Sequence, residues 1–184
     1  MIRHGDGEHT LDLPASLELA DPRLTDTGRG QVLALAASLG ITGHDLLVVS
    51  PTRRTLETAS ILRGDSDARV VVSPEVGPRM FRVDRGWLPL RCDQLLSLAA
   101  IRVDFPAGEI RRADLWPGGI NTMPAEVFEA IGRNLLVWCV QQDARRTLIV
   151  SHDGTVYNYR KLLLGAPDLP MERLGPAGHV VMSI

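Results

Sequence analysis

Two histidines far apart in the sequence stand in settings that suit phosphoryl transfer. One lies in residues 3–5 (Arg-His-Gly) and the other in residues 151–154 (Ser-His-Asp-Gly), while residues 50–55 (Ser-Pro-Thr-Arg-Arg-Thr) contribute Arg54. Arginine offers a charged bidentate fork to phosphate oxygens. Histidine serves as nucleophile or as acid and base near neutral pH. These residue types indicate a single phosphate-binding site, provided that the fold brings them together.

Short apolar runs precede two of these clusters and predict the strands that position them. We expect strands at 46–50, 69–72, 147–151 and 179–184. We expect helices at 27–39, 52–62, 93–100, 124–141 and 155–164. The alternation predicts an α/β fold, a three-layer sandwich with a mostly parallel central sheet and helices on both faces. The polar clusters would then meet at the carboxyl edge of the sheet.

The length of 184 residues predicts a single domain, residues 1–184. Residues 74–120 are its irregular part, an insertion in which Phe105, Trp87 and Trp116 either line a substrate pocket or belong to the core. Only two residues precede Arg3. The first strand is therefore very short, or an upstream portion is missing, and the sequence leaves both open.

The composition excludes several classes of protein. A net charge of −2 gives no reason to expect nucleic acid or an anionic membrane as a partner. Two cysteines are too few for a disulfide scaffold, and no apolar run approaches the ~20 residues of a membrane span. Without a signal-peptide pattern, we expect a cytoplasmic protein. The five histidines lack zinc-site spacing, so we expect no metal and no cofactor. A homodimer is compatible with this composition.

Four motifs, in order along the chain, resemble those of the histidine phosphatase superfamily, the phosphoglycerate-mutase-like and acid-phosphatase-like group. They are Arg3-His4-Gly5; Leu24-Thr25 with Gly28 and Gln31; Ser50-Pro51 with Arg54 and Thr58-Ala59; and Ser151-His152. The string 3–9, together with Cys92-Asp93, is similar to a microbial and fungal branch of small members.

The resemblance implies roles for individual residues. His4 would be the nucleophile that forms a phosphohistidine, and Arg3, Arg54 and His152 would bind the phosphoryl oxygens. Asp153 would donate a proton to the leaving group, as the aspartate of a His-Asp pair does in the acid-phosphatase branch. Further substrate-binding candidates are Gly5, His9, Thr10, Ser50 and Gly154.

The proton donor is the open point of this reading. The mutase-like branch places a glutamate after the third strand, where this chain has Pro78 or a neighbour. Asp153 could instead be only a helix cap. Asp84, Glu75 and Asp93 are therefore alternative donors.

The leading hypothesis is a metal-independent phosphatase that hydrolyses a small-metabolite phosphate monoester through a phosphohistidine. A phosphoglycerate-type mutase is one alternative, although the short chain counts against it. A non-hydrolytic or repurposed member is another, kept open by the missing glutamate.

Overall fold

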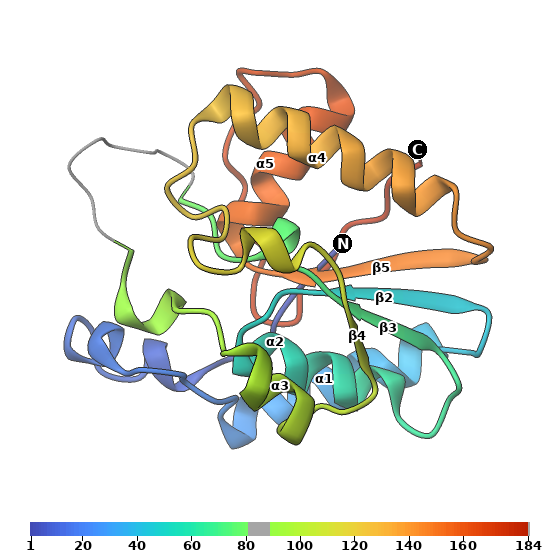
Figure 1. Ribbon diagram of the computed structural model, residues 1–184. Coiled ribbons are helices and arrows are strands. Elements are labelled where there is room, and N and C mark those ends of the chain that lie inside the picture. The colour runs from blue at the N-terminus through green and yellow to red at the C-terminus, as the bar shows by residue number, and fades with distance from the viewer. Residues whose placement is uncertain (81–88, 184) are drawn as a thin grey trace.

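A parallel five-stranded sheet forms the centre of the computed structural model, which describes residues 1–80 and 89–183 (Figure 1). The spatial order of its strands is β1-β5-β2-β3-β4, and all paired neighbours run parallel. The strands are β1 (Ile2–Arg3), β2 (Asp45–Val49), β3 (Arg69–Val72), β4 (Gly108–Ile110) and β5 (Arg146–Ser151).

Helices cover both faces of this sheet. They are α1 (Asp26–Leu39), α2 (Arg53–Arg63), α3 (Leu98–Asp104), α4 (Ala125–Val140) and α5 (Asp153–Leu164). Helices α4 and α5 lie on one face, and α1, α2 and α3 lie on the other (Figure 1). The sequence-based prediction of a three-layer α/β sandwich is confirmed.

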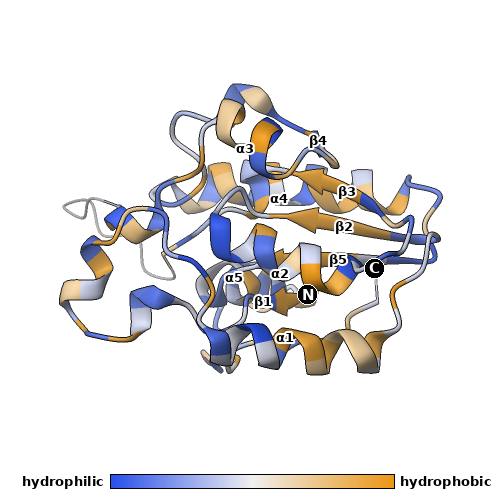
Figure 2. Cartoon of the chain, turned by 90° about the horizontal axis from the view of Figure 1, so that it is seen from below, coloured by the Kyte–Doolittle hydropathy of each residue, from blue (hydrophilic) through white to orange (hydrophobic). Residues whose placement is uncertain are grey.

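Alternation along the central strands explains why the sheet is covered on both sides. In β2, Leu47 and Val49 pack into the core beneath α1 and α2, whereas Leu46 and Val48 pack into the core beneath α4 and α5. Successive side chains of a strand point to opposite faces, so an uninterrupted apolar run must be covered twice. The central strands are accordingly hydrophobic along their length in Figure 2.

Local sequence signals fix the ends of the helices. Thr25 caps α1 by accepting a hydrogen bond from the backbone N–H of Gly28 at 2.9 Å. Gly40 ends α1 in the left-handed region with φ 53°, and Gly165 ends α5 with φ 61°. In the part of the chain that the structure describes, no helix has the length and apolar character needed to cross a membrane.

Two sequence-based expectations about elements were wrong, and one strand was missed. Residues 179–183 form no strand; the segment makes only an isolated antiparallel bridge between His179 and Ile2, and Val181 is 90% exposed. The helix expected at 93–100 begins at Leu98, after a separate turn of 3-10 helix. Strand β4 was not expected at all.

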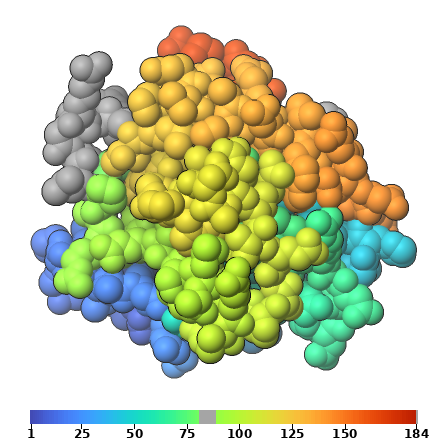
Figure 3. Space-filling view, viewed as in Figure 1, coloured from blue at the N-terminus to red at the C-terminus, as the bar shows by residue number. Residues whose placement is uncertain are grey.

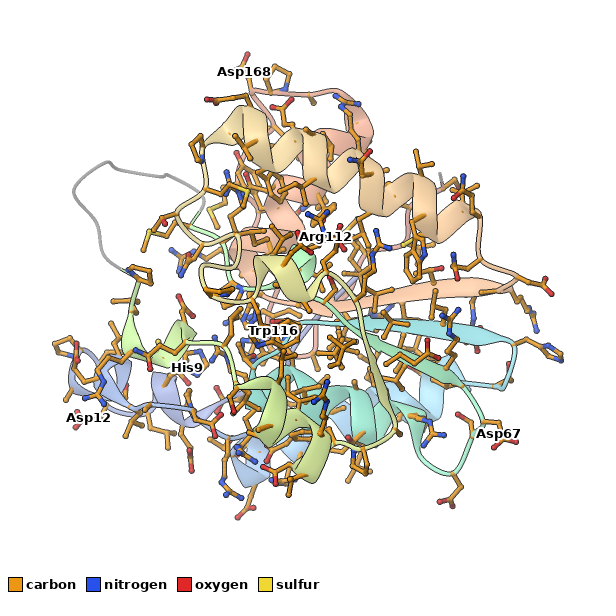
Figure 4. The ribbon with its side chains drawn as sticks, viewed as in Figure 1. His9, Asp12, Asp67, Arg112, Trp116 and Asp168 are labelled. Carbon is orange, nitrogen blue, oxygen red and sulfur yellow. The ribbon has the colours of Figure 1, made fainter. Side chains whose placement is uncertain are left out.

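Residues 89–120 contain α3 and β4 and form much of the side of the molecule that faces the viewer in Figure 3. Trp116 belongs to the core here, because it is buried and its indole Nε1 donates to the carbonyl of Leu96 at 2.7 Å (Figure 4). Phe105 packs against the same core. Trp87 and Asp84 lie outside the described residues.

Candidate active site

The predicted site residues meet at the carboxyl edge of the sheet. His4 directly follows β1, Arg54 lies in the first turn of α2 after β2, and His152 is the N-cap of α5 after β5. His9 lies at this end of the molecule and Asp67 at the opposite end (Figure 4). A cavity of about 270 Å³ opens here. Its lining consists of Arg3, His4, His9, Arg54, Pro78, Arg79, Met80, Asp93, His152, Asp153, Gly154, Met171 and Arg173.

The ring of His4 is held in one orientation. Its Nδ1 lies 2.7 Å from the carbonyl oxygen of Gly5, which can only accept, so Nδ1 carries the proton and Nε2 keeps its lone pair. Burial, followed by the charge of Arg54, holds the pKa of His4 well below its usual value. The imidazole is therefore neutral at neutral pH, and the lone pair on Nε2 suits a nucleophile or a base.

Arg54 links most of the other site residues. Its Nε donates to His4 Nε2 at 3.3 Å, and its Nη2 lies 3.1 Å from His152 Nδ1. The same guanidinium donates to the Cys92 carbonyl at 2.5 Å and to the Asp93 carboxylate at 2.9 Å. With only 1% of its surface exposed, Arg54 is a fixed cation between the two histidines.

His152 faces His4 across the cavity, with ring centroids 5.2 Å apart. Its Nε2 lies 2.8 Å from the hydroxyl of Ser50, which is fully buried. Ser50 therefore orients His152 and is not part of the cavity lining. Burial, then Arg54, lowers the pKa of His152 well below its usual value.

His9 packs against the other side of His4, with ring centroids 5.3 Å apart. Burial and the charges of Arg54 and Arg3 lower its pKa to about 3. The cavity therefore combines neutral imidazoles with positive guanidinium groups, which is a suitable environment for an anion.

Asp153 and Arg3 both form hydrogen bonds with the backbone of Leu174. The Asp153 Oδ1 accepts from the Leu174 N–H at 2.9 Å, and Arg3 Nη1 donates to the Leu174 carbonyl. The segment after α5 is thereby drawn to the cavity, where Met171 and Arg173 join the lining. Sequence reasoning missed this segment, because nothing in its composition marks it as part of a site.

Two groups of residues can now be distinguished. We call Arg3, His4, Arg54 and His152 the cradle, since they surround the space in front of His4. We call Arg79, Asp93, Asp153 and residues 171–174 the wall, since they come from loops and helix starts around that space.

The alternative proton donors differ in their positions. Asp93 belongs to the wall, where it accepts from Arg54 and, at 3.4 Å, from the Asn121 amide. Glu75 does not line the cavity: it is fully buried and paired with Arg111 at 2.7 Å.

Of the remaining predicted residues, only some line the cavity. Gly154 lines it, whereas Gly5 and Thr10 do not. A Cβ on Gly5 would lie 2.6 Å from the carbonyl oxygen of Gly28, so this glycine permits close packing of the nucleophile loop on α1. Thr10 donates to Asp6 at 2.9 Å. Contacts of these residues with substrate stay predictions.

Arg79 is the wall residue that sequence reasoning missed. Its guanidinium stacks 4.2 Å from the ring centre of Phe128, and Nη1 donates to the carbonyls of Ile120 and Met123 at 2.8 and 2.9 Å. Burial lowers its pKa to about 10, so it remains charged at neutral pH. Its one sequence signal was its place after the third strand, where the mutase-like branch has a glutamate.

No group of three or more histidine, cysteine, aspartate or glutamate residues is arranged to hold a metal ion within residues 1–80 and 89–183. The cations of the site are therefore arginines. Independence from metal stays a prediction for the reaction itself.

The sequence and the fold can now be compared with those of known proteins. The family model of the histidine phosphatase superfamily (branch 1) matches residues 1–85. No curated protein sequence matches the chain. A mycobacterial glucosyl-3-phosphoglycerate phosphatase solved with VO3 is similar in structure, with 25% identity, a TM-score of 0.57, and coverage of 96% of this chain and 88% of its own.

A phosphoserine phosphatase from Entamoeba histolytica, solved with 3-phosphoglyceric acid, has 21% identity and a TM-score of 0.62. The match covers 96% of this chain and 85% of that one, and at this identity it shows the fold alone. The family model covers the segment that carries His4 and Arg54. The matches to the two solved structures extend over 96% of this chain. Residues 1–85 thus match the model of the histidine phosphatase superfamily (branch 1), and the fold of nearly the whole chain is similar to that of solved phosphatases.

Proposed function

We propose that this protein is a phosphatase that hydrolyses a small phosphate monoester, without a metal ion, through a phosphohistidine on His4. The observation that carries the proposal is the environment of His4. Its Nδ1 is turned to the Gly5 carbonyl, so Nε2 keeps its lone pair, which accepts a long hydrogen bond from Arg54 Nε, and the ring lies opposite His152. A phosphoryl group in this cavity would meet a nucleophile and two stabilising groups at once.

The proposed reaction has two steps. His4 Nε2 attacks phosphorus, the P–O bond to the leaving group breaks, and Asp153 gives a proton to the departing oxygen. Water then attacks the phosphohistidine and transfers a proton to the Asp153 carboxylate, which releases phosphate and restores His4. Arg3, Arg54 and His152 stabilise the charge on the phosphoryl oxygens in both steps.

The non-hydrolytic alternative keeps one observation in its favour. Both carboxylates of the cavity lining are already engaged, Asp93 by Arg54 and Asp153 by the Leu174 N–H. If neither can donate a proton, the cradle would bind phosphate without turning over an alkyl ester. Tight binding of orthovanadate without hydrolysis of any ester would identify that case.

The test is turnover of 4-nitrophenyl phosphate in the presence of a chelator, with an alkaline quench and mass spectrometry to detect phosphohistidine. Wild type should turn over and carry one phosphoryl group on His4. The variant His4→Ala should lose both, by orders of magnitude in rate. His44→Ala is the matched control, because His44 is exposed in a turn away from the cavity. Full activity in His4→Ala, or loss with the chelator, would contradict the proposal.

A further inference from the structure

The central cation of the cradle is paired with a carboxylate that the proposed chemistry does not use. Arg54 Nη2 donates to Asp93 Oδ1 at 2.9 Å, and the exposed fractions of the two side chains are 1% and 20%. Among the described residues, no other carboxylate bonds to a cradle side chain, since Asp153 is engaged by the Leu174 N–H. Asp93 is therefore the counter-ion of Arg54.

The guanidinium of Arg54 has little spare capacity for a ligand. It carries five N–H groups. Nε donates to His4 and Nη1 donates to the Cys92 carbonyl. Nη2 donates to both Asp93 and His152. A phosphoryl group that Arg54 binds through two parallel N–H groups must therefore take over a bond that another group now accepts.

Among these partners of Arg54, Asp93 is the one that competes with a phosphoryl group by its charge. The Cys92 carbonyl and the two imidazoles are neutral. The bond from Arg54 to His4 Nε2 is lost in any case when that nitrogen attacks phosphorus. The Asp93 carboxylate, by contrast, is an anion beside the place that a second anion must occupy, and like charges at short range repel each other.

Neighbouring contacts keep the Asp93 carboxylate in this position. Its Oδ2 accepts from the Asn121 side chain at 3.4 Å, and Asn121 Oδ1 accepts from the Met80 N–H at 3.0 Å. Three residues further along the chain, the Leu96 N–H donates at 2.8 Å to the carbonyl of Pro51, which lies just before α2. The charge of Asp93 therefore acts on any anion that binds to Arg54.

From this arrangement we infer that Asp93 is a positioning residue that acts through Arg54: it fixes the guanidinium, competes with phosphate for Nη2, and so speeds release of the product. This inference rests on the proposed function and adds to it a determinant of product release. Asp93 transfers no proton in this role, which separates it from the alternative in which it is the proton donor.

Binding of inorganic phosphate is the first test, because it needs no turnover. Asp93→Asn keeps an oxygen for Arg54 Nη2 but removes the negative charge. The variant should bind phosphate roughly 3- to 30-fold more tightly than wild type in calorimetry, the range for removal of one nearby charge. Equal or weaker binding would overturn the inference.

Two further variants test whether the charge at this position is the cause. Asp104→Asn is the matched control, because Asp104 is also paired with an arginine, Arg53, at 3.0 Å but does not line the cavity. It should bind phosphate as wild type does. Asp93→Glu keeps the charge and should stay within about threefold of the wild-type affinity. Tighter binding in either variant would overturn the inference.

Turnover then separates release of phosphate from the chemical steps. Stopped-flow measurement with a fluorescent phosphate sensor should show that release from Asp93→Asn slows by roughly the same 3- to 30-fold. The kcat for nitrophenyl phosphate should fall, because its good leaving group makes a late step limiting, whereas its kcat/KM should not fall. A proton donor would give the opposite pattern, with the greater loss on alkyl phosphates and unchanged release, and this result would overturn the inference.

Thermal unfolding provides a readout of stability. Loss of the counter-ion of a buried arginine destabilises the protein. Phosphate should therefore raise the Tm of Asp93→Asn by more than it raises that of wild type. If circular dichroism shows that Asp93→Asn does not fold even with phosphate, Asp93→Ser replaces it in the binding measurement, with the same expected and overturning results.

The binding measurement also distinguishes this inference from the proposed function. If no ester is turned over, the proposed function fails, yet Asp93→Asn should still bind phosphate more tightly than wild type. If esters are turned over but Asp93→Asn binds and releases phosphate as wild type does, the proposed function stands and the role of Asp93 is overturned.

Discussion

The cradle and the wall border the same cavity but are built differently. His4, Arg54 and His152 each stand one to five residues beyond the end of a sheet strand, and all three are at least nine-tenths buried. Apart from Asp153, which begins α5, and Asp93, which lies in a turn of 3-10 helix, the wall comes from segments between or after the regular elements. It is held by contacts such as that of the Asp153 carboxylate with the Leu174 N–H.

The difference suggests a division of labour. The sheet fixes the residues that would handle the phosphoryl group, which every phosphate ester shares. Loops position the residues that face the rest of the substrate, where members of one fold can diverge without disturbing the core. Variants in the cradle should therefore affect all esters, and variants in the wall should affect some esters more than others.

The largest effect should follow removal of the central cation of the cradle. Arg54→Met should lower kcat by roughly 10³–10⁵-fold for every ester, the range for an arginine that stabilises phosphoryl transfer. Steady-state kinetics with an aryl and an alkyl phosphate measure it. Arg63→Met, at the far end of α2, is the control and should keep its activity. A loss that depends strongly on the ester would contradict the assignment of Arg54 to the phosphoryl group that all esters share.

A smaller and selective effect is expected in the wall. Asp153→Asn keeps an acceptor for the Leu174 N–H but cannot donate a carboxyl proton. Alkyl phosphates, which have poor leaving groups, should lose about 10²–10⁴-fold in rate, and nitrophenyl phosphate should lose less than about tenfold. An equal loss on both would assign Asp153 to positioning only and direct the search for the donor to Asp93 or Asp84.

The third prediction concerns acid stability. His9 has a pKa of about 3 in the folded protein and about 6.5 when unfolded, so between these values the unfolded chain binds an extra proton. The contribution of His9 to the free energy of unfolding must then fall as the pH decreases below 6.5. Between pH 7.5 and pH 5.0, His9→Gln should lose about 1–2 kcal/mol less of its free energy of unfolding than wild type.

Urea titrations at the two pH values measure this difference. His44→Gln is the control, because an exposed histidine should follow wild type. The same loss in His9→Gln as in wild type would mean that His9 is not held neutral against His4.

The smallest effect is expected from the core beneath the wall. Trp116→Phe removes the hydrogen bond to the Leu96 carbonyl and part of a buried ring. Thermal unfolding should show a loss of about 1–2 kcal/mol. Turnover of nitrophenyl phosphate should stay within about threefold, and a larger change would make Trp116 part of the substrate site.

The same division explains what could be predicted from the sequence. Strands β2, β3 and β5 are apolar runs covered on both faces, and their predicted bounds were within one residue of the structure. The polar residues that follow β2 and β5 could be found because parallel strands bring their carboxyl ends to one edge. Periodicity thus predicted the frame of the cradle, although the roles of its residues stay predictions.

Elsewhere the local signal was weak or misleading. Strand β4 has three residues, one of them glycine; none is fully buried, and the strand exists through its pairing with β3. Val180 and Val181 suggested a strand, but the segment finds only the single bridge from His179 to Ile2. Arg79 could not be singled out in a chain whose basic residues are nearly all arginine, because its importance comes from what surrounds it.

The anchoring of β1 has a consequence for how the protein folds. The Arg3 N–H donates to the Gly178 carbonyl, and the Ala177 N–H donates to the His4 carbonyl. Strand β1 pairs with β5 at residues 150–151, and Ile2 also bridges His179. These contacts join segments that are far apart in the sequence, so closing them is slow in entropic terms. We therefore expect His4 to reach its place in the cavity late in folding.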